Sequence, residues 1–208
     1  MRTIQKGREP ASLIQHRQQL HADYDNYADK ATLRQVLVAE QRSLCCYCQS
    51  RIRATPESMK IEHWQCQADH PGRQLDFGNL HGACLGGHGK PDREQHCDTR
   101  KGNNGLCFSV CDPAHPIERK IKFLGDGRIE SDDVAINNAL NGVLNLNYSR
   151  LVDNRKAMLE AFKQRLGKGA LNAEQELRKW DGTQAGDLPE FAQVMVFWLQ
   201  KKISRGAA

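Results

Sequence analysis

The chain has 208 residues, of which 39% are hydrophobic and 26% are charged. These values exclude a wholly disordered chain and allow one compact domain with appendages or two small domains. The formal net charge is +5, yet residues 61–150 hold 10 Lys and Arg against 12 Asp and Glu, whereas both flanking segments have an excess of Lys and Arg. An acidic middle with basic flanks suits a cation site whose polyanionic substrate is held from the sides, although a solvated surface of mixed charge explains it too.

The sequence predicts a cytoplasmic protein without a membrane span. Residues 1–6 lead into polar sequence with no apolar segment typical of a signal peptide. The longest apolar run, residues 194–199, is far too short to cross a bilayer. In a reducing compartment, the eight cysteines favour metal ligation or buried thiols over disulfides.

Helical spacing of apolar residues predicts two helices within residues 10–43, the first ending near Asp25 and Asn26 and the second near Arg42. From residue 44 to residue 104 the periodicity fades, and Cys, His, Gly and Asn become frequent. Within this segment we expect a short strand at residues 60–64, loops at 65–76 and 85–95, and a short helix at 96–103 that Gly102 limits.

Strand character returns after residue 105, where residues 119–124 and 128–130 flank Gly125-Asp126-Gly127 and predict a hairpin. Four helices are expected in the last third, over about 132–142, 148–166, 172–180 and 188–203. The predicted fold class is α+β, with an irregular zinc-bound core wrapped by helices. We divide the chain into a helical segment (1–43), a core with a hairpin (44–131) and a second helical segment (132–208).

Cysteines at metal-ligand spacing stand at the start of the core. Cys45 and Cys48 form a C-x-x-C pair, which can offer two thiolates to one Zn²⁺ from a single tight turn. Cys84 and Cys97 are the preferred third and fourth ligands, because they flank the loop between Asn79 and the next helix. The competing ligands are Cys46, Cys66, His88, His96 and the pair Cys107 and Cys111. Buried thiols without a metal are the plainer alternative, but the nearby His and polar loops favour zinc.

A carboxylate beside an imidazole ends the predicted strand. Glu62 is a hard oxygen ligand suited to Mg²⁺ or Mn²⁺, and His63 titrates near neutrality and can accept a proton from an attacking water. Asp98 follows Cys97 directly, so a zinc ion on Cys97 would fix it as a second carboxylate for the cation. Lys101, one turn further, is placed to meet a phosphate.

Asn79 completes the predicted catalytic site. Its amide can bond backbone carbonyls and fix the loop that faces His63, or contact the metal. Each of these residues alone has a plain explanation, such as a half-buried strand histidine, a turn asparagine or a carboxylate at a helix start. Their joint order around the cysteines favours a catalytic site instead.

The order of these motifs resembles that of HNH, or ββα-metal, nucleases. It reads Cys45–Cys48, Glu62-His63, Asn79-Leu80 to Cys84, and Cys97-Asp98 with Lys101. The chain also resembles the PtuB-type HNH proteins of Septu and retron antiphage defence systems. The segments that carry this further similarity are Cys45-Cys46-Tyr47-Cys48, Ile61-Glu62-His63-Trp64, Asp112-Pro113, Gly127-Arg128-Ile129, residues 144–147 and Asn154-Arg155.

The resemblance implies a zinc-stabilised ββα-metal core flanked by helices. It implies that His63 is the general base, that Glu62 and Asp98 hold Mg²⁺ or Mn²⁺, and that Asn79 orients the site or binds the metal. The implied partners are a PtuA-like ABC/SMC-type ATPase, nucleic acid, and a retron reverse transcriptase with its msDNA. Asp98 stands where the family has its last His, which makes the cation environment harder. The loop between Cys84 and Cys97 is longer than in many members, which leaves His88 or His96 open as a replacement ligand.

We therefore expect a metal-dependent endonuclease that hydrolyses phosphodiester bonds. The alternative is a non-catalytic zinc module that binds nucleic acid or a partner protein. The sequence has no ladder of aromatic and basic residues, so it does not tell a DNA substrate from a tRNA substrate. The apolar stretches at residues 33–39 and 192–203 are expected to pack on the core, with docking of a partner as the alternative.

Overall fold

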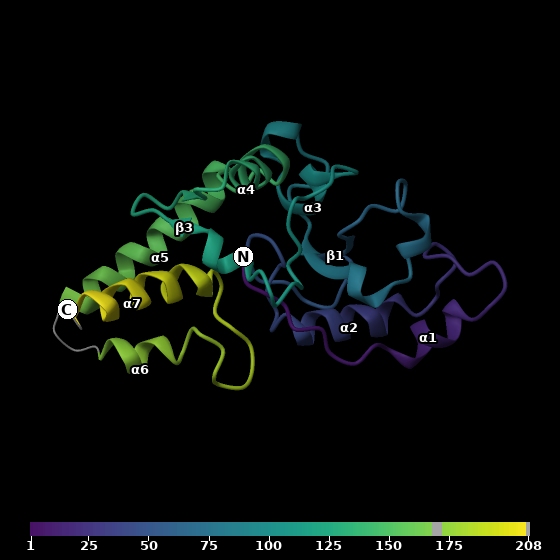
Figure 1. The fold of residues 1–208 in the computed structure, drawn as a ribbon, viewed down its shortest axis with the longest axis horizontal. Coiled ribbons are helices and arrows are strands. Elements are labelled where there is room, and N and C mark those ends of the chain that lie inside the picture. The colour runs from purple at the N-terminus through teal and green to yellow at the C-terminus, as the bar shows by residue number, and fades with distance from the viewer. Residues whose placement is uncertain (168–171, 207–208) are drawn as a thin grey trace.

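The computed structural model describes residues 1–167 and 172–206. Figure 1 shows an elongated molecule with α1 and α2 toward one end and α5, α6 and α7 at the other. The helices are α1 (Ala11–Arg17), α2 (Lys30–Glu40), α3 (Cys97–Lys101), α4 (Val134–Asn138), α5 (Ser149–Gly167), α6 (Ala173–Leu177) and α7 (Ala192–Gly206). The strands are β1 (Met59–His63), β2 (Leu80–Cys84), β3 (Lys122–Phe123) and β4 (Ile129–Glu130).

Two antiparallel strands and a short helix form the centre of the molecule. β1 pairs with β2 along its whole length, so that Glu62 lies opposite His81 and His63 lies opposite Leu80. β2 packs against both α2 and α3. The expected strand at residues 60–64 is thus confirmed within one residue at each end, whereas β2, a second strand that the implied ββα core includes, had no predicted residue range.

The first helix is shorter than the sequence predicted. It ends at Arg17, and Leu20, which lies within the range of the predicted helix, is 87% exposed. His21 has a φ of 60°, which a right-handed helix does not allow. Asp23 and Asn26 then exchange side-chain to backbone hydrogen bonds of 2.7 and 3.0 Å, which stabilise a turn in place of a helix.

The second helix forms where its capping signal lies. The Asp29 side chain accepts a hydrogen bond of 3.2 Å from the backbone N–H of Thr32, and Leu33 and Leu37 are fully buried one turn apart. The stretch at residues 33–39 therefore packs mainly on the core, as expected.

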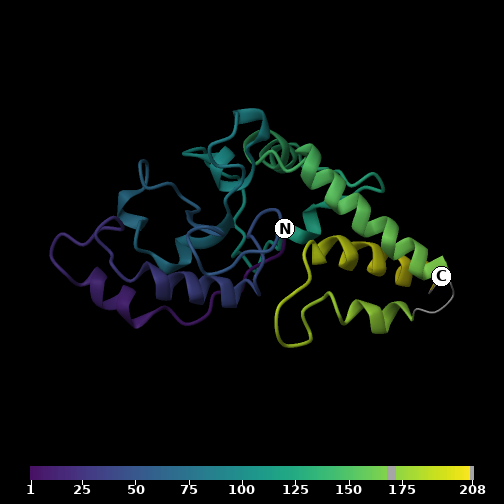
Figure 2. The ribbon, with the colours of Figure 1, turned by 180° about the vertical axis from the view of Figure 1, so that it is seen from behind.

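The hairpin and the C-terminal helices make a second layer. β3 and β4 pair across the predicted turn, in which Gly127 has a φ of 90°. A Cβ at Gly127 would lie 2.3 Å from the carbonyl oxygen of Val152 on α5, so only glycine allows this approach. α7 contacts β3, α5 and α6, and Figure 2 shows α5 and α7 side by side from behind. The four expected C-terminal helical regions are present, each with revised ends.

The largest buried cluster joins all three predicted segments. It includes Ile4 near the start of the chain, Ile52 and Met59 around the first strand, and Leu140 and Val194 from the last third. Burial of this shared apolar surface holds the strand–strand–helix unit against the hairpin and the helices. None of the described helices combines the length and the apolar character needed to cross a membrane.

Candidate metal centre and catalytic cavity

Four cysteine sulfurs converge at the base of the strand–strand–helix unit. The Sγ atoms of Cys45, Cys48, Cys84 and Cys97 all lie within 4.8 Å of one another. Cys45 and Cys97 are 3.9 Å apart at sulfur, and Cys48 and Cys84 are 3.6 Å apart. Zn–S bonds of about 2.3 Å in a tetrahedron require S···S separations of about 3.8 Å, so this cluster could hold a metal such as zinc.

Tight turns bring each pair of cysteines to the cluster. Residues 44–51 form a turn in which the backbone N–H of Gln49 donates to Cys45 and that of Cys45 donates to Ser50, at 3.1 and 2.9 Å. After Cys84, Gly86 turns the chain with a φ of 55°, and a Cβ there would lie 2.1 Å from the carbonyl oxygen of His96. The long loop between Cys84 and Cys97 therefore closes on itself and returns the chain to the cluster.

The predicted competing ligands lie outside the set of four. His88 is exposed. The Cys66 thiol contacts Asp69 at 3.2 Å, and Cys111 lies beside His81 at 3.8 Å. His96 is the nearest competitor, with Nδ1 3.2 Å from the sulfur of Cys97. An Nδ1–H there donates to the sulfur and supports the ligand set from outside.

Four buried thiolates would carry negative charge that a cation has to balance. Burial and the neighbouring thiols raise the pKa of Cys97 well above its usual value, so four thiolates do not form together without positive charge nearby. Arg155 on α5 is 3% exposed, and its guanidinium donates to the carbonyls of Gly127 and Leu146 at 2.7 and 2.8 Å. Burial lowers the pKa of Arg155 to about 10, while the charges of Cys48 and Cys97 oppose that shift, so this arginine remains a cation at pH 7.

A cavity of about 260 Å³ brings the predicted catalytic residues together. Glu62, His63 and Asp98 line it, from the end of β1 and the start of α3. Lys60 also lines it and lies 3.8 Å from Asp98, with its Nζ donating to Thr99 at 2.9 Å. The cavity thus joins two carboxylates, an imidazole and an ammonium group that the chain carries on separate elements.

Two donors hold Glu62. The Tyr47 hydroxyl donates to Oε1 at 2.7 Å, and Lys101 Nζ lies 2.9 Å from the same oxygen. Glu62 is only 2% exposed, and burial followed by the adjacent Asp98 raises the pKa of its carboxyl group well above the usual value. Among the described residues both hydrogen bonds reach Oε1, which leaves Oε2 for a cation.

His63 is held as a neutral imidazole. Its Nε2 lies 3.0 Å from the carbonyl oxygen of Gln74, which assigns the ring proton to Nε2 and the lone pair to Nδ1. Burial lowers the pKa of His63, and Lys101 acts in the same direction, whereas the Gln74 carbonyl and Asp98 oppose it. The ring of Tyr24 contacts His63 edge-on, with centroids 4.5 Å apart, and the Gln67 side-chain nitrogen lies 3.0 Å from Nε2 and 3.4 Å from Nδ1.

Asn79 lies beside the cavity and does not line it. It is fully buried, its Oδ1 accepts from the backbone N–H of Gln65 at 2.8 Å, and its Nδ2 donates to the carbonyls of Gln65 and Arg73 at 3.0 Å. Its polar atoms are therefore occupied in fixing residues 64–79, the loop that carries Gln74 to His63. Of the two roles considered for Asn79, these contacts match orientation of the loop and leave no free atom for a metal.

Lys101 has a different place from the expected one. The sequence suggested that it meets a phosphate, but its side chain is 1% exposed and bonds the carbonyl of His63 as well as Glu62. The physical reason is that α3 packs on β2, which turns this side chain inward. Lys60 brings the ammonium group to the cavity instead.

Sequence reasoning also missed Tyr47, Gln67 and Tyr24. Tyr47 could have been found from the sequence, because it lies inside the C-x-x-C motif. Cysteines that bind one metal on either side of it would fix the position of its backbone. Gln67 and Tyr24 lie in irregular segments and gave no signal. In a comparison with known proteins, neither the protein-family models nor the curated proteins give a significant match to this chain.

Proposed function

We propose that this chain is a metal-dependent endonuclease of the HNH type, which hydrolyses phosphodiester bonds at the cavity of Glu62, His63 and Asp98. The observation that carries the proposal is the convergence of these three side chains beside the cysteine cluster. A strand pair followed by a short helix, with the imidazole at a strand end and a carboxylate in the first turn of the helix, agrees with the resemblance in motif order.

The paired carboxylates fit a divalent cation. Asp98 lies close enough to Glu62 to disfavour ionisation of the Glu62 carboxyl group, and positive charge beside Glu62 would offset that effect. Oxygen-only ligands favour Mg²⁺ or Mn²⁺. When bound, such a cation would supply electrostatic stabilisation at the phosphate oxygens.

The other residues act around that pair. His63 is neutral at pH 7 and takes the proton of the attacking water at Nδ1, while the Gln74 carbonyl holds Nε2–H and fixes the ring. Lys60 reaches the cavity with a partly exposed ammonium group and binds a phosphate oxygen of the substrate. Tyr47 and Lys101 hold Glu62 through Oε1, and Asn79 holds the loop behind His63.

The cysteine cluster has a structural role in this proposal. Zn²⁺ bound by Cys45, Cys48, Cys84 and Cys97 would fix the two turns that supply Tyr47 and Asp98. Zinc therefore positions the catalytic groups without contacting the substrate. The resemblance also leads us to propose an ABC/SMC-type ATPase as partner within an antiphage defence complex, with a retron reverse transcriptase and its msDNA as further components.

The test is cleavage by the purified chain, with and without the ATPase encoded beside it, of DNA and of total tRNA in Mg²⁺ or Mn²⁺. We expect His63→Ala to lose cleavage at least ~100-fold, as expected for a general base, and to keep its cysteine-bound zinc. Glu62→Gln should lose cation-dependent cleavage. Arg8→Ala should retain it, because Arg8 is exposed and does not line the cavity. Undiminished cleavage by His63→Ala would contradict the assignment, and no cleavage under any condition would favour the non-catalytic zinc module.

A further inference from the structure

Cationic and aromatic side chains gather around Trp198, away from the catalytic cavity. A cavity of about 760 Å³ lies between the β3–β4 hairpin and α7, and one of about 250 Å³ lies between α5 and α7. Both are lined by Trp198 and Lys201, and we call the two cavities together the Trp198 groove. Its cationic residues are Lys122, Lys163, Lys201, Lys202 and Arg205.

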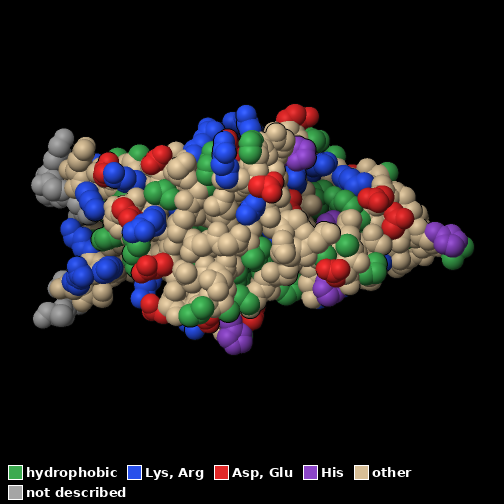
Figure 3. All heavy atoms as spheres, turned by 90° about the horizontal axis from the view of Figure 1, so that it is seen from above, with side chains coloured by type: hydrophobic (Ala, Val, Ile, Leu, Met, Phe, Trp, Pro, Cys, Tyr) green, Lys and Arg blue, Asp and Glu red, His purple; other side chains and the backbone are tan. Residues whose placement is uncertain are grey.

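The groove carries positive charge that the protein does not neutralise. Lys122 pairs with Asp132 at 2.5 Å, whereas the other four cationic side chains form no ion pair within residues 1–167 and 172–206. Glu130 is the single acidic residue in its lining. Figure 3 shows Lys and Arg side chains gathered at the end of the molecule where α5 and α7 finish. Unpaired cations at this density favour a ligand with several negative charges.

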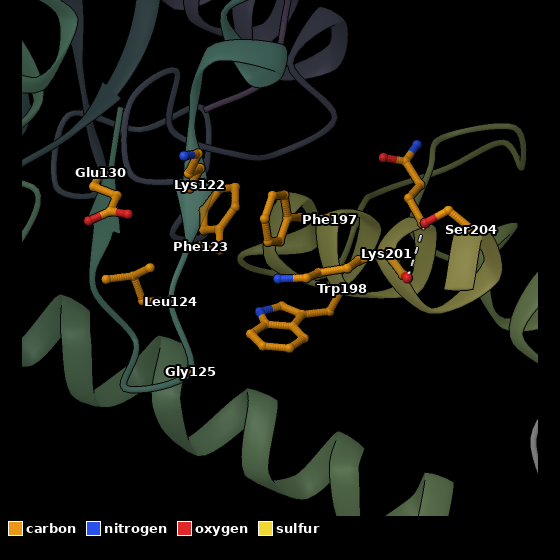
Figure 4. A pocket seen from close by; sticks show the side chains of 10 residues that line it. Lys122, Phe123, Leu124, Gly125, Glu130, Phe197, Trp198, Lys201 and Ser204 are labelled. Carbon is orange, nitrogen blue, oxygen red and sulfur yellow. Dashed lines mark hydrogen bonds between the residues drawn. The ribbon is translucent and has the colours of Figure 1, made fainter. Parts of the chain in front are cut away.

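Trp198 adds a donor and an aromatic face. Its Nε1–H is buried and has no acceptor in the part of the chain that the structure describes. Buried indole N–H groups normally have a partner, so a bound acceptor would complete this site. Lys163 and Lys201 Nζ lie 5.2 and 5.3 Å from the ring centroid, and in Figure 4 the Lys201 side chain extends across the ring toward the hairpin.

We propose that the Trp198 groove binds a short segment of single-stranded nucleic acid. One base stacks on the Trp198 indole, and the adjacent phosphates meet Lys163, Lys201 and Lys202. Exposed lysine side chains have several rotatable bonds, so they can leave the ring face to reach a phosphate. A base offers both a flat face and carbonyl acceptors, whereas an acidic peptide offers the charge without the face. This binding does not depend on whether the chain cuts nucleic acid.

The test measures fluorescence anisotropy of labelled single-stranded DNA and RNA of about 12 nucleotides, with the full chain and no added Mg²⁺ or Mn²⁺. Trp198→Ala should weaken binding about tenfold through loss of stacking. Lys163→Ala and Lys201→Ala should each reduce the slope of log K against log salt by about 0.7. Arg8→Ala is the matched control, because Arg8 is also exposed and has no ion pair with any described residue, and its slope should stay unchanged.

Three outcomes would overturn the proposal. If both lysine variants keep the wild-type affinity and salt slope, the single-stranded nucleic acid does not bind in this groove. Both lysines are exposed, so these variants still test the proposal if Trp198→Ala fails to fold. Equal affinity for a duplex of the same sequence would exclude base stacking. Displacement of the strand by a mononucleotide at comparable concentration would assign the groove to free nucleotides instead.

Discussion

Two buried side chains, Glu62 and His81, lie opposite each other on the paired strands. They differ in how the cost of burying a titratable group is met. Glu62 keeps two hydrogen-bond partners, Tyr47 and Lys101, which offset part of the cost of burying its carboxyl group. His81 is fully buried, with Cys111 at 3.8 Å from its ring nitrogens, and it remains neutral. Burial lowers the pKa of His81 to about 3, and the charges of Lys6 and Lys101 add to the effect.

The state of His81 predicts a pH dependence of stability. The unfolded chain binds a proton at His81 below about pH 6.5 while the folded chain does not, so stability is complete above that pH and falls as the pH drops. Between pH 7 and pH 5.5 this should cost about 1 kcal/mol of unfolding free energy. Urea unfolding of wild type and His81→Gln across this interval measures it, and the variant should lose correspondingly less. An identical pH dependence in both proteins would contradict the assignment.

At the scale of elements, the loop of residues 64–79 depends on one amide. Asn79 forms three hydrogen bonds to the backbone of Gln65 and Arg73, at opposite ends of the loop. This is why an irregular segment between β1 and β2 can hold the Gln74 carbonyl 3.0 Å from His63. The strand pair supplies position, and the loop supplies orientation of the ring.

Asn79→Ala should lower the free energy of unfolding by about 3 kcal/mol, because it leaves buried backbone groups without partners. Asn104→Ala is the comparison, since Asn104 is exposed and makes one hydrogen bond of 2.8 Å, to the carbonyl of Lys101. Its loss should stay below about 1 kcal/mol. Chemical denaturation of both variants measures the difference, and equal losses would argue against a special role for Asn79.

On the scale of the whole molecule, the cysteine cluster connects segments far apart in the chain. Its sulfurs come from the turn after α2, the end of β2 and the start of α3, and the charge of Arg155 on α5 interacts with Cys48 and Cys97. A bound metal would therefore stabilise the contact between the central unit and the C-terminal helices as well as the turns themselves.

We predict about one zinc ion per chain, as a closed site of four cysteines implies. Cys97→Ser should lose the ion and melt about 10 °C or more below wild type. Cys107→Ser should keep both the zinc content and the melting temperature, because Cys107 is exposed and outside the cluster. Elemental analysis with thermal unfolding tests this, and full zinc content in Cys97→Ser would remove Cys97 from the ligand set.

Local chemistry explains which features could be predicted from the sequence. The C-x-x-C spacing, the Gly125-Asp126-Gly127 turn and the end of α3 at Gly102 act within a few residues, so a linear pattern reveals them. The helix expected up to Asp25 was wrong because Asp23 and Asn26 bond each other's backbone, a competition that apolar spacing does not register. The convergence of Cys84 and Cys97 with the first pair followed from motif order and is present in the structure.

The sequence by itself determined the residue types, the α+β composition and the order of the cysteine motifs and the Glu62-His63 and Asp98 positions. Only the tertiary structure decided that Lys101 is buried against Glu62 while Lys60 reaches the cavity, because the packing of α3 on β2 sets those directions. It also assembled Lys163 of α5 and Lys201 of α7 around Trp198, where the linear sequence has no ladder of basic and aromatic residues. Such neighbours arise from the packing of whole helices, and no local pattern in the chain encodes their contact.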